Sequence, residues 1–181
     1  MIEPWQPIET RDGFRNRWLH VTLDTVRLPN DRSYEYTTIR RDKPGVAVAV
    51  IDAQDRLLLE REYRLPVDEV IYQLPGGLAD VDEDLVDSMR RELREETGIL
   101  AGHLRHLGCF WNNPASSNGQ CHIFLCRDFQ AGLPTDHDAA EFLSWEWRDL
   151  SWVKTAVADG RIRDRVVLCA LAYLWLAGEL T

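Results

Sequence analysis

The chain has 181 residues, of which 45% are hydrophobic and 28% are charged, a composition typical of one soluble globular domain with a sizeable core. Its formal net charge of −9 argues against a broad nucleic-acid surface, which requires clustered lysine and arginine. An anionic ligand remains compatible with this charge, because an acidic protein can bind phosphates through a divalent metal ion.

The sequence shows no targeting or membrane segment. Its first ten residues, MIEPWQPIET, have neither the basic start nor the apolar run of a signal peptide. The longest apolar run, 166–177, is too short to cross a bilayer and predicts a buried helix. The four cysteines lack zinc-ligand spacing and are expected to be free, mostly buried thiols. We therefore expect a cytoplasmic protein with no membrane and no nucleic-acid partner.

Two segments near the N-terminus have the character of strands. Residues 15–28 alternate apolar and polar side chains, and residues 33–41 are rich in β-formers. Between them, residues 29–31 (Pro-Asn-Asp) are typical of a turn. The pattern predicts a β-hairpin ahead of the main body.

Strands dominate the remainder of the chain. They are expected at residues 45–52, 56–64, 70–74, 104–111, 121–127 and 141–147. One helix is expected after the acidic patch at residues 80–84, a second over 150–159, and a third after Asp164, which can cap it. The predicted class is α+β in a single domain.

The stretch 77–99, GLADVDEDLVDSMRRELREETGI, holds three glutamates within five residues. Carboxylates about 5 Å apart repel by about 3 kcal/mol at an effective dielectric constant of 20, so water or a cation must offset that repulsion. On a helical wheel, Glu92 and Glu96 overlap the edge of the apolar sector, whereas Glu95 lies further from it. The bland interpretation is a solvated charged face. A carboxylate pair held against the body of the protein is instead what a hard-cation site requires.

Two neighbouring features also allow two interpretations. Arg91 lies one helical turn before Glu95, so it either organises the carboxylates or forms a weak surface ion pair with Glu95. Gly77 either simply ends a strand or lets the backbone come close to a metal ion and offer a carbonyl ligand.

The spacing of these residues resembles that of the Nudix box. Gly77 is followed by Glu83, then by Arg91-Glu92-Leu93, Glu95-Glu96 and Gly98-Ile99, and all nine specified positions match. The resemblance implies an α/β/α sandwich around a mixed sheet, in which the box forms a loop, a helix and a second loop. It also implies hydrolysis of a nucleoside diphosphate linked to another moiety.

The same resemblance assigns roles to the residues of the box. Glu92, Glu95 and Glu96 would bind Mg²⁺, or Mn²⁺, with the carbonyl of Gly76 as a further ligand. The catalytic set would comprise Glu95 itself, Glu83 as an assisting carboxylate and Arg91 as the residue that fixes the glutamates.

The flanks resemble the ADP-ribose pyrophosphatase and nucleoside-diphosphate-sugar hydrolase branch of the family. Pro114 lies 15 residues beyond Ile99, close to where ADP-ribose hydrolases carry a proline. The N-terminal region 1–42 corresponds to strands that such enzymes exchange across a homodimer, and residues 43–181 correspond to the Nudix fold. The resemblance therefore implies a homodimer that binds a nucleoside diphosphate sugar.

Several residues outside the box are candidates for substrate binding. Trp18 and Tyr36 occupy positions where relatives place aromatic residues that sandwich the base, although each can equally be a packing residue of a sheet. Arg64 is a candidate for binding the diphosphate or ribose, with a surface arginine as the alternative, and Arg41 is a weaker candidate.

The loops differ from the family pattern at one place and leave the general base open. Relatives often carry an acidic residue shortly after the proline, but residues 115–120 contain none, which weakens the specific assignment to ADP-ribose. Relatives draw the general base from a loop before a late strand. Glu141 matches that position, with Glu146 as the fallback, although Glu141 can equally be an edge-strand glutamate with no role. His137 is a group able to move protons near neutral pH, with a solvated loop histidine as the alternative.

Two rival functions follow from the same sequence. The chain can hydrolyse another nucleoside diphosphate derivative, such as GDP-mannose, UDP-glucose, a dinucleotide or a coenzyme A compound. It can also be a non-catalytic sensor, although sensors are expected to lose glutamates of the box or to gain a DNA-binding domain, and this chain does neither.

Overall fold

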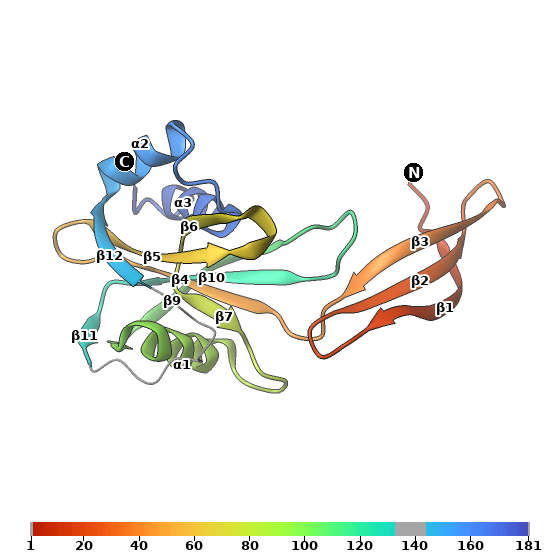
Figure 1. The fold of residues 1–181 in the computed structure, drawn as a ribbon, viewed down its shortest axis with the longest axis horizontal. Coiled ribbons are helices and arrows are strands. Elements are labelled where there is room, and N and C mark those ends of the chain that lie inside the picture. Colours follow the sequence, from red (N-terminus) through yellow and green to blue (C-terminus); the bar gives the residue numbers. More distant parts are fainter. Residues whose placement is uncertain (1, 133–143, 181) are drawn as a thin grey trace. The chain divides into compact units, whose positions relative to one another are not determined.

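The computed structural model describes residues 2–132 and 144–180. The chain forms two compact units (Figure 1). The N-terminal unit comprises residues 1–44 and 111–120, and the main unit comprises residues 45–110 and 121–181.

The N-terminal unit contains a three-stranded antiparallel sheet in the order β1-β2-β3. Its strands are β1 (Gln6–Arg15), β2 (His20–Arg27) and β3 (Ser33–Arg40). The expected hairpin is present as β2 and β3, but the expectation of only two strands was wrong. The strand β1 carries no apolar alternation and is exposed along its whole length, so the sequence lacked a periodic signal there. Its register shifts near Pro7 and Gly13 are typical of an edge strand.

A polar network holds this sheet together. Asp24 of β2 is buried and accepts hydrogen bonds from Thr10 (2.8 Å), Thr38 (2.6 Å) and the guanidinium of Arg40 (2.8 and 2.9 Å). Burial alone would raise the pKa of Asp24, but these hydrogen bonds outweigh it and the pKa is lowered. Asp24 therefore stays ionised and links all three strands.

The main unit is built on a mixed sheet. Four strands lie in the order β7 (Gly76–Leu78), β4 (Gly45–Val50), β10 (Gln120–Cys126) and β9 (Leu104–Trp111), with β4 and β10 parallel and β4 and β7 antiparallel. A second sheet has the order β12 (Ser144–Asp149), β5 (Arg56–Arg64) and β6 (Glu69–Gln73), with the short 3-10 helix η1 (Leu65–Val67) between β5 and β6. The short strands β8 (Ile99–Ala101) and β11 (Phe129–Ala131) form an antiparallel pair.

Helices cover both faces of the main sheet (Figure 1). On one face α1 (Leu85–Thr97) packs Met89 and Leu93 against Val48 and Phe124. On the other face, α2 (Leu150–Ala158) and α3 (Arg165–Leu176) pack against the alternate residues of the same strands. Because side chains alternate along β4 and β10, each strand contributes to both cores, which explains their continuous apolar sequences. The predicted α+β class, with a mixed sheet between helical layers, is confirmed.

The ends of the helices follow the sequence signals. Asp84 caps α1 by accepting from the N–H groups of Val86 and Asp87, and Gly98 ends it with a φ of 74°. Asp164 caps α3 as expected. The cysteines are free thiols; two are buried, one is half-buried and Cys109 is exposed. Within the described part of the chain, no helix is long and apolar enough to cross a membrane.

Candidate active site

Two consecutive glycines of β7 bring the strand close to α1. A Cβ atom on Gly76 would lie 2.1 Å from the carbonyl oxygen of Val46, and its φ of +157° disfavours an L side chain. A Cβ atom on Gly77 would lie 2.5 Å from the carboxyl carbon of Glu92. Gly76 therefore permits the pairing of β7 with β4, and Gly77 leaves the space that the carboxylate of Glu92 fills.

The helix α1 presents its glutamates as the wheel predicted. Glu96 is only 8% exposed, and one of its carboxylate oxygens accepts the N–H of Gly76 at 2.8 Å. The side chain of Glu92 is 15% exposed, whereas that of Glu95 is 48% exposed. Glu92 and Glu96 thus belong to the packed side of the helix, and the alternative interpretation of a simple solvated face does not describe either of them.

Arg91 joins three carboxylates. Its Nη1 atom lies 2.9 Å from Glu92 and 3.3 Å from Glu95, and its Nη2 atom lies 3.0 Å from Glu83. Nη2 also donates to the carbonyl oxygen of Leu78 at 3.4 Å. The expected contact with Glu95 is present, and the guanidinium also ties the loop before α1 to the helix.

These contacts shift the pKa values of Glu83 and Arg91. The hydrogen bond from Arg91 is the largest cause that lowers the pKa of Glu83 to about 2, and the backbone N–H of Asp80 contributes as well. In turn, Glu83 and Glu92 raise the pKa of Arg91. The loop 80–84 is therefore fixed to the helix by a charge pair that persists through the whole neutral range.

The donor set fits a hard divalent cation. Three carboxylates and a glycine carbonyl are oxygen ligands, which Mg²⁺ and Mn²⁺ prefer, and the space above Gly77 is reserved for one of those carboxylates. In residues 2–132 and 144–180, no three His, Cys, Asp or Glu side chains are already gathered in a form that could hold a metal ion. The reason is visible in the contacts: Arg91 holds Glu92 and Glu95, and Glu96 turns to Gly76. Metal binding would require these side chains to rotate toward a shared point.

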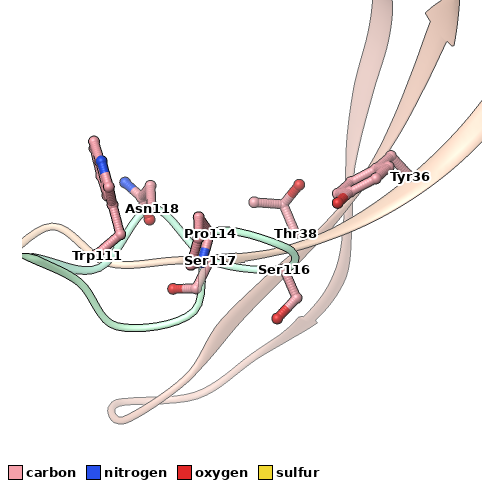
Figure 2. Close-up of a pocket in the computed structure, with 7 residues that line it drawn as sticks. All are labelled: Tyr36, Thr38, Trp111, Pro114, Ser116, Ser117 and Asn118. Atoms are coloured by element: carbon pink, nitrogen blue, oxygen red, sulfur yellow. The ribbon is translucent and has the colours of Figure 1, made fainter. Parts of the chain in front are cut away.

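A pocket of about 390 Å³ lies within the N-terminal unit (Figure 2). Strand β3 forms one part of its wall, and the loop between β9 and β10 forms the other. Its lining residues are uncharged: Tyr36, Thr38, Trp111, Pro114, Ser116, Ser117 and Asn118. Two aromatic rings and a proline beside hydroxyl groups suit a planar, neutral part of a ligand better than a phosphate.

Hydrogen bonds fix the pocket loop to β3. The N–H of Ile39 donates to the carbonyl of Ser116 at 2.7 Å, and the hydroxyl of Tyr36 donates to the carbonyl of Ala115. The side-chain amide of Asn118 accepts from the N–H of Arg41 at 2.7 Å and donates to its carbonyl at 3.1 Å. The amide thus bonds both backbone groups of Arg41, as a neighbouring β-strand would. Hydrogen bonds within the chain therefore hold the shape of the pocket.

Trp18 lies apart from this pocket. It is 69% exposed in the turn between β1 and β2, where the guanidinium of Arg17 stacks on its ring at 4.5 Å. The register pairs Arg40 with His20 and Tyr36 with Asp24, so Tyr36 lies about 14 Å along the strand from the end near Trp18. One chain therefore does not bring Trp18 and Tyr36 together around one base.

The two predicted arginines have structural partners. Arg41 donates to the carbonyl of Trp18 at 3.0 Å within the N-terminal unit. Arg64 donates to Gln73 at 2.8 Å and forms an ion pair with Glu62 at 2.8 Å. Their proposed contacts with substrate remain predictions.

Of the three candidates for the general base, the structure describes only Glu146. Glu141 and His137 lie outside the described residues. Glu146, the fallback, lies on β12, and both of its carboxylate oxygens accept hydrogen bonds of 2.9 Å from the guanidinium of Arg148.

Sequence reasoning missed most of the pocket. Pro114 and Tyr36 were named, but Trp111, Thr38 and Asn118 were not, although all three line the pocket. The available signal was the polar loop that directly follows Trp111, since a polar loop next to an exposed aromatic residue is a typical binding surface.

Comparison with known proteins covers both units. The family model described as NUDIX domain matches residues 41–171. The model described as nucleoside diphosphate sugar hydrolase N-terminal domain matches residues 5–43, the region that holds β1, β2 and β3.

The similar proteins have diverse names. A methanol dehydrogenase activator of Bacillus methanolicus is 28% identical over 93% of this chain and 91% of its own length. A CMP-5'-(N-acetyl-N-hydroxy-3-aminopropyl)phosphonate hydrolase of Streptomyces rubellomurinus is 30% identical, over 90% of this chain and 79% of its own length. An ADP-ribose pyrophosphatase of Bacillus subtilis is 26% identical, over 90% and 88% of the two chains.

A solved structure has the same fold. The crystal structure of an ADP compounds hydrolase superposes with a TM-score of 0.87, covering 99% of this chain and 97% of the other at 21% identity. The family match spans most of the main unit, and the box residues occupy the geometry described above. The chain therefore belongs to the Nudix family of hydrolases.

Proposed function

We propose that the protein is a Mg²⁺-dependent pyrophosphohydrolase that cleaves the diphosphate of ADP-ribose, giving AMP and ribose 5-phosphate, or of a related nucleoside diphosphate sugar. The observation that carries the proposal is the gathering of Glu83, Glu92 and Glu95 around Arg91, with Glu96 on the same helix bonded to the N–H of Gly76 in β7. Such a concentration of carboxylates at one end of a buried helix face suits the binding of a cation that in turn binds phosphate.

The residues of the box have distinct tasks in this proposal. Glu92, Glu95 and Glu96 hold Mg²⁺, or Mn²⁺, together with the carbonyl of Gly76. The bound ion would offset the charge of the phosphate oxygens and lower the pKa of a bound water. Arg91 is a positioning residue, because it keeps the carboxylates from separating before the ion binds.

The remaining catalytic tasks fall to two carboxylates. Glu83 fixes the loop 80–84 through Arg91 and assists the cluster from there. Glu141 remains our candidate for the general base that takes the proton of the attacking water.

The pocket of the N-terminal unit supports a nucleoside as one part of the substrate. Tyr36 and Trp111 offer rings on which a base can stack, and Pro114 and the serine hydroxyls complete an uncharged wall (Figure 2). The match of residues 5–43 to an N-terminal domain of nucleoside diphosphate sugar hydrolases supports the same substrate class.

The main alternative is another nucleoside diphosphate derivative. Residues 115–120 carry no carboxylate, so a group often used by ADP-ribose hydrolases is missing from this loop. The similar proteins also differ in their named activities, from an ADP-ribose pyrophosphatase to a CMP-linked phosphonate hydrolase. GDP-mannose, UDP-glucose, dinucleotides and coenzyme A compounds therefore belong in the test.

We also propose that the protein acts in the cytoplasm as a homodimer that joins through its N-terminal strands. Trp5, Phe14 and Tyr34 of the N-terminal unit are each about half exposed, and a second copy would cover such apolar side chains. Free thiols at all four cysteines suit a reducing compartment.

A substrate panel tests the proposal. The protein is incubated with Mg²⁺ or Mn²⁺ and with ADP-ribose, GDP-mannose, UDP-glucose or NADH, and phosphate is measured after alkaline phosphatase treatment. A coenzyme A compound is followed by chromatography of its products, because alkaline phosphatase releases its 3'-phosphate without prior cleavage. We expect ADP-ribose or one sugar nucleotide to be turned over fastest, with activity abolished by EDTA and restored by added metal. Absence of turnover for every compound with either metal would reject the enzyme and favour a sensor that binds without cleavage.

A further inference from the structure

Two histidines of neighbouring strands meet away from the carboxylate cluster. His106 lies on β9 and His122 on β10, and the Nε2 atom of the first is 3.1 Å from the Nδ1 atom of the second. The ring centroids are 5.2 Å apart, and the planes are tilted by 38°. The catalytic proposal uses neither residue.

From this geometry we propose that His106 and His122 together chelate a divalent transition metal ion of the Zn²⁺, Cu²⁺ or Ni²⁺ class. Metal–nitrogen bonds of about 2.0–2.1 Å at angles of about 90–109° place two ligand nitrogens about 2.8–3.4 Å apart. The observed separation of 3.1 Å lies within this range. The two nitrogens are therefore already spaced as neighbouring ligands of one ion.

The rings are held in place by the sheet. β9 and β10 are hydrogen-bonded neighbours, so the two Cα atoms cannot drift apart without breaking the sheet. The ring of His106 packs edge-on against the buried Phe124, with centroids 5.2 Å apart. Little conformational entropy remains to be lost on metal binding, which favours affinity.

Protonation and access also suit a metal ligand. Burial, and then the neighbouring His106, lower the pKa of His122, which keeps its imidazole neutral and its lone pair available near neutral pH. His106 is exposed, so water can occupy the other coordination positions. The ring that now carries the shared proton would take its other tautomer, because a neutral imidazole keeps one N–H.

The site differs in chemistry from the box. Imidazole nitrogens prefer Zn²⁺, Cu²⁺ and Ni²⁺, whereas the carboxylates of Glu92 and Glu96 prefer Mg²⁺ or Mn²⁺. The register places His122 beside Val46 and Val46 beside Gly77, so His122 lies on the face covered by α1 and two strand spacings, about 10 Å, from Gly77, and His106 lies one strand further away. The histidine site and the proposed hydrolysis can therefore fail independently.

Copper EPR tests the pair directly. Protein freed of metal with EDTA receives one equivalent of Cu²⁺, and the nitrogen superhyperfine splitting reports how many imidazoles bind the ion. We expect a two-nitrogen pattern in the wild type. His106→Gln and His122→Gln should each lose that pattern and lower the Cu²⁺ affinity by about tenfold or more.

Matched variants separate this site from other ligands of copper. His103→Gln removes an exposed histidine of the same unit and should keep the two-nitrogen pattern, as should Glu96→Gln. Because His106 is exposed, His106→Gln is expected to fold even where His122→Gln does not, and circular dichroism checks both. An unchanged pattern in His106→Gln, or a wild-type spectrum without nitrogen splitting, would overturn the proposal.

Discussion

The carboxylate cluster and the aromatic pocket are built in opposite ways. The cluster comes from one short stretch of chain and is held by charge, with Arg91 between Glu83, Glu92 and Glu95. The pocket joins segments far apart in the sequence, such as Tyr36 and Ala115, and its loop is held by backbone, amide and hydroxyl hydrogen bonds. The first arrangement depends on one short stretch of chain, and the second depends on tertiary contacts between distant segments.

If the carboxylate cluster serves catalysis and the pocket serves recognition, a substitution in the cluster should lower turnover without changing which substrate is preferred. Glu96→Gln tests this most strongly, because the substitution removes one charge from the metal site while keeping the shape of the side chain. We expect kcat to fall by at least about 10²-fold with the fold intact. Steady-state kinetics and a thermal melt measure the two effects.

Asp87→Asn is the control for that experiment. Asp87 lies on the same helix, but its side chain is 68% exposed, so its loss of charge should leave kcat nearly unchanged. An unchanged rate in Glu96→Gln would show that the carboxylate of Glu96 serves only the contact with Gly76.

Substitutions at the two glycines of β7 should affect catalysis and stability differently. A methyl group at Gly77 meets the movable end of Glu92, so Gly77→Ala should displace that carboxylate and lower kcat by about tenfold with a small change in stability. A methyl group at Gly76 meets the backbone of Val46, so Gly76→Ala should cost about 2 kcal/mol or more of the free energy of unfolding.

Urea denaturation and kinetics on both variants decide this comparison. The expected result is a clear stability loss only in Gly76→Ala and a clear rate loss in Gly77→Ala. If Gly77→Ala were as unstable as Gly76→Ala and showed a normal rate when folded, the space above Gly77 would serve packing and not the metal site.

Damage to the pocket should have the complementary effect. Trp111→Ala removes a ring from the pocket wall and should raise KM for the preferred nucleotide by about tenfold, within the 1–3 kcal/mol of base stacking, while kcat stays close to normal. Kinetics with two nucleotides that differ only in the base would show whether the loss depends on the base.

Two other tryptophans serve as comparisons for Trp111. Trp175→Ala, on the exposed side of α3, should leave KM unchanged. Trp18→Ala should do so too if one chain makes the whole base site, and should raise KM if a partner copy brings Trp18 to the pocket. A normal KM in Trp111→Ala would remove the pocket from substrate binding.

The same contrast explains what the sequence could predict. The positions of Glu92 and Glu96 on the packed face follow from helical periodicity, because both lie on one regular element whose buried side is marked by Met89 and Leu93. The pocket does not follow in this way, because Tyr36 approaches Ala115 only through tertiary pairing of β3 with a loop. Strand β1 was missed for a related reason: its residues are all exposed, so no alternation marks it.

The contribution of the carboxylate cluster to stability should also depend on pH. The effect expected at Glu83 is the smallest of those predicted, but it is specific to one carboxylate. The pKa of Glu83 is lowered from 4.5 to about 2 in the folded protein, and the hydrogen bond from Arg91 is the largest cause. A carboxyl group whose pKa is depressed by folding stabilises the fold above its unfolded pKa, and this contribution is lost as the pH falls toward the folded pKa. The difference in Tm between the wild type and Glu83→Gln should therefore be largest above about pH 4.5 and should shrink as the pH approaches about 2.

An Arg91→Ala background provides the control for this pH dependence. Arg91 is the largest cause of the shift, so Glu83→Gln should make little pH-dependent difference to Tm once the guanidinium is gone. If the window between pH 4.5 and about 2 persisted in that background, the uncharged donors, Ser88 and the backbone N–H of Asp80, would be sufficient to lower the pKa of Glu83. Its persistence would also mean that the guanidinium of Arg91 is not the main source of the depressed pKa, and that this carboxylate, like the pocket loop, is held chiefly by hydrogen bonds from uncharged donors.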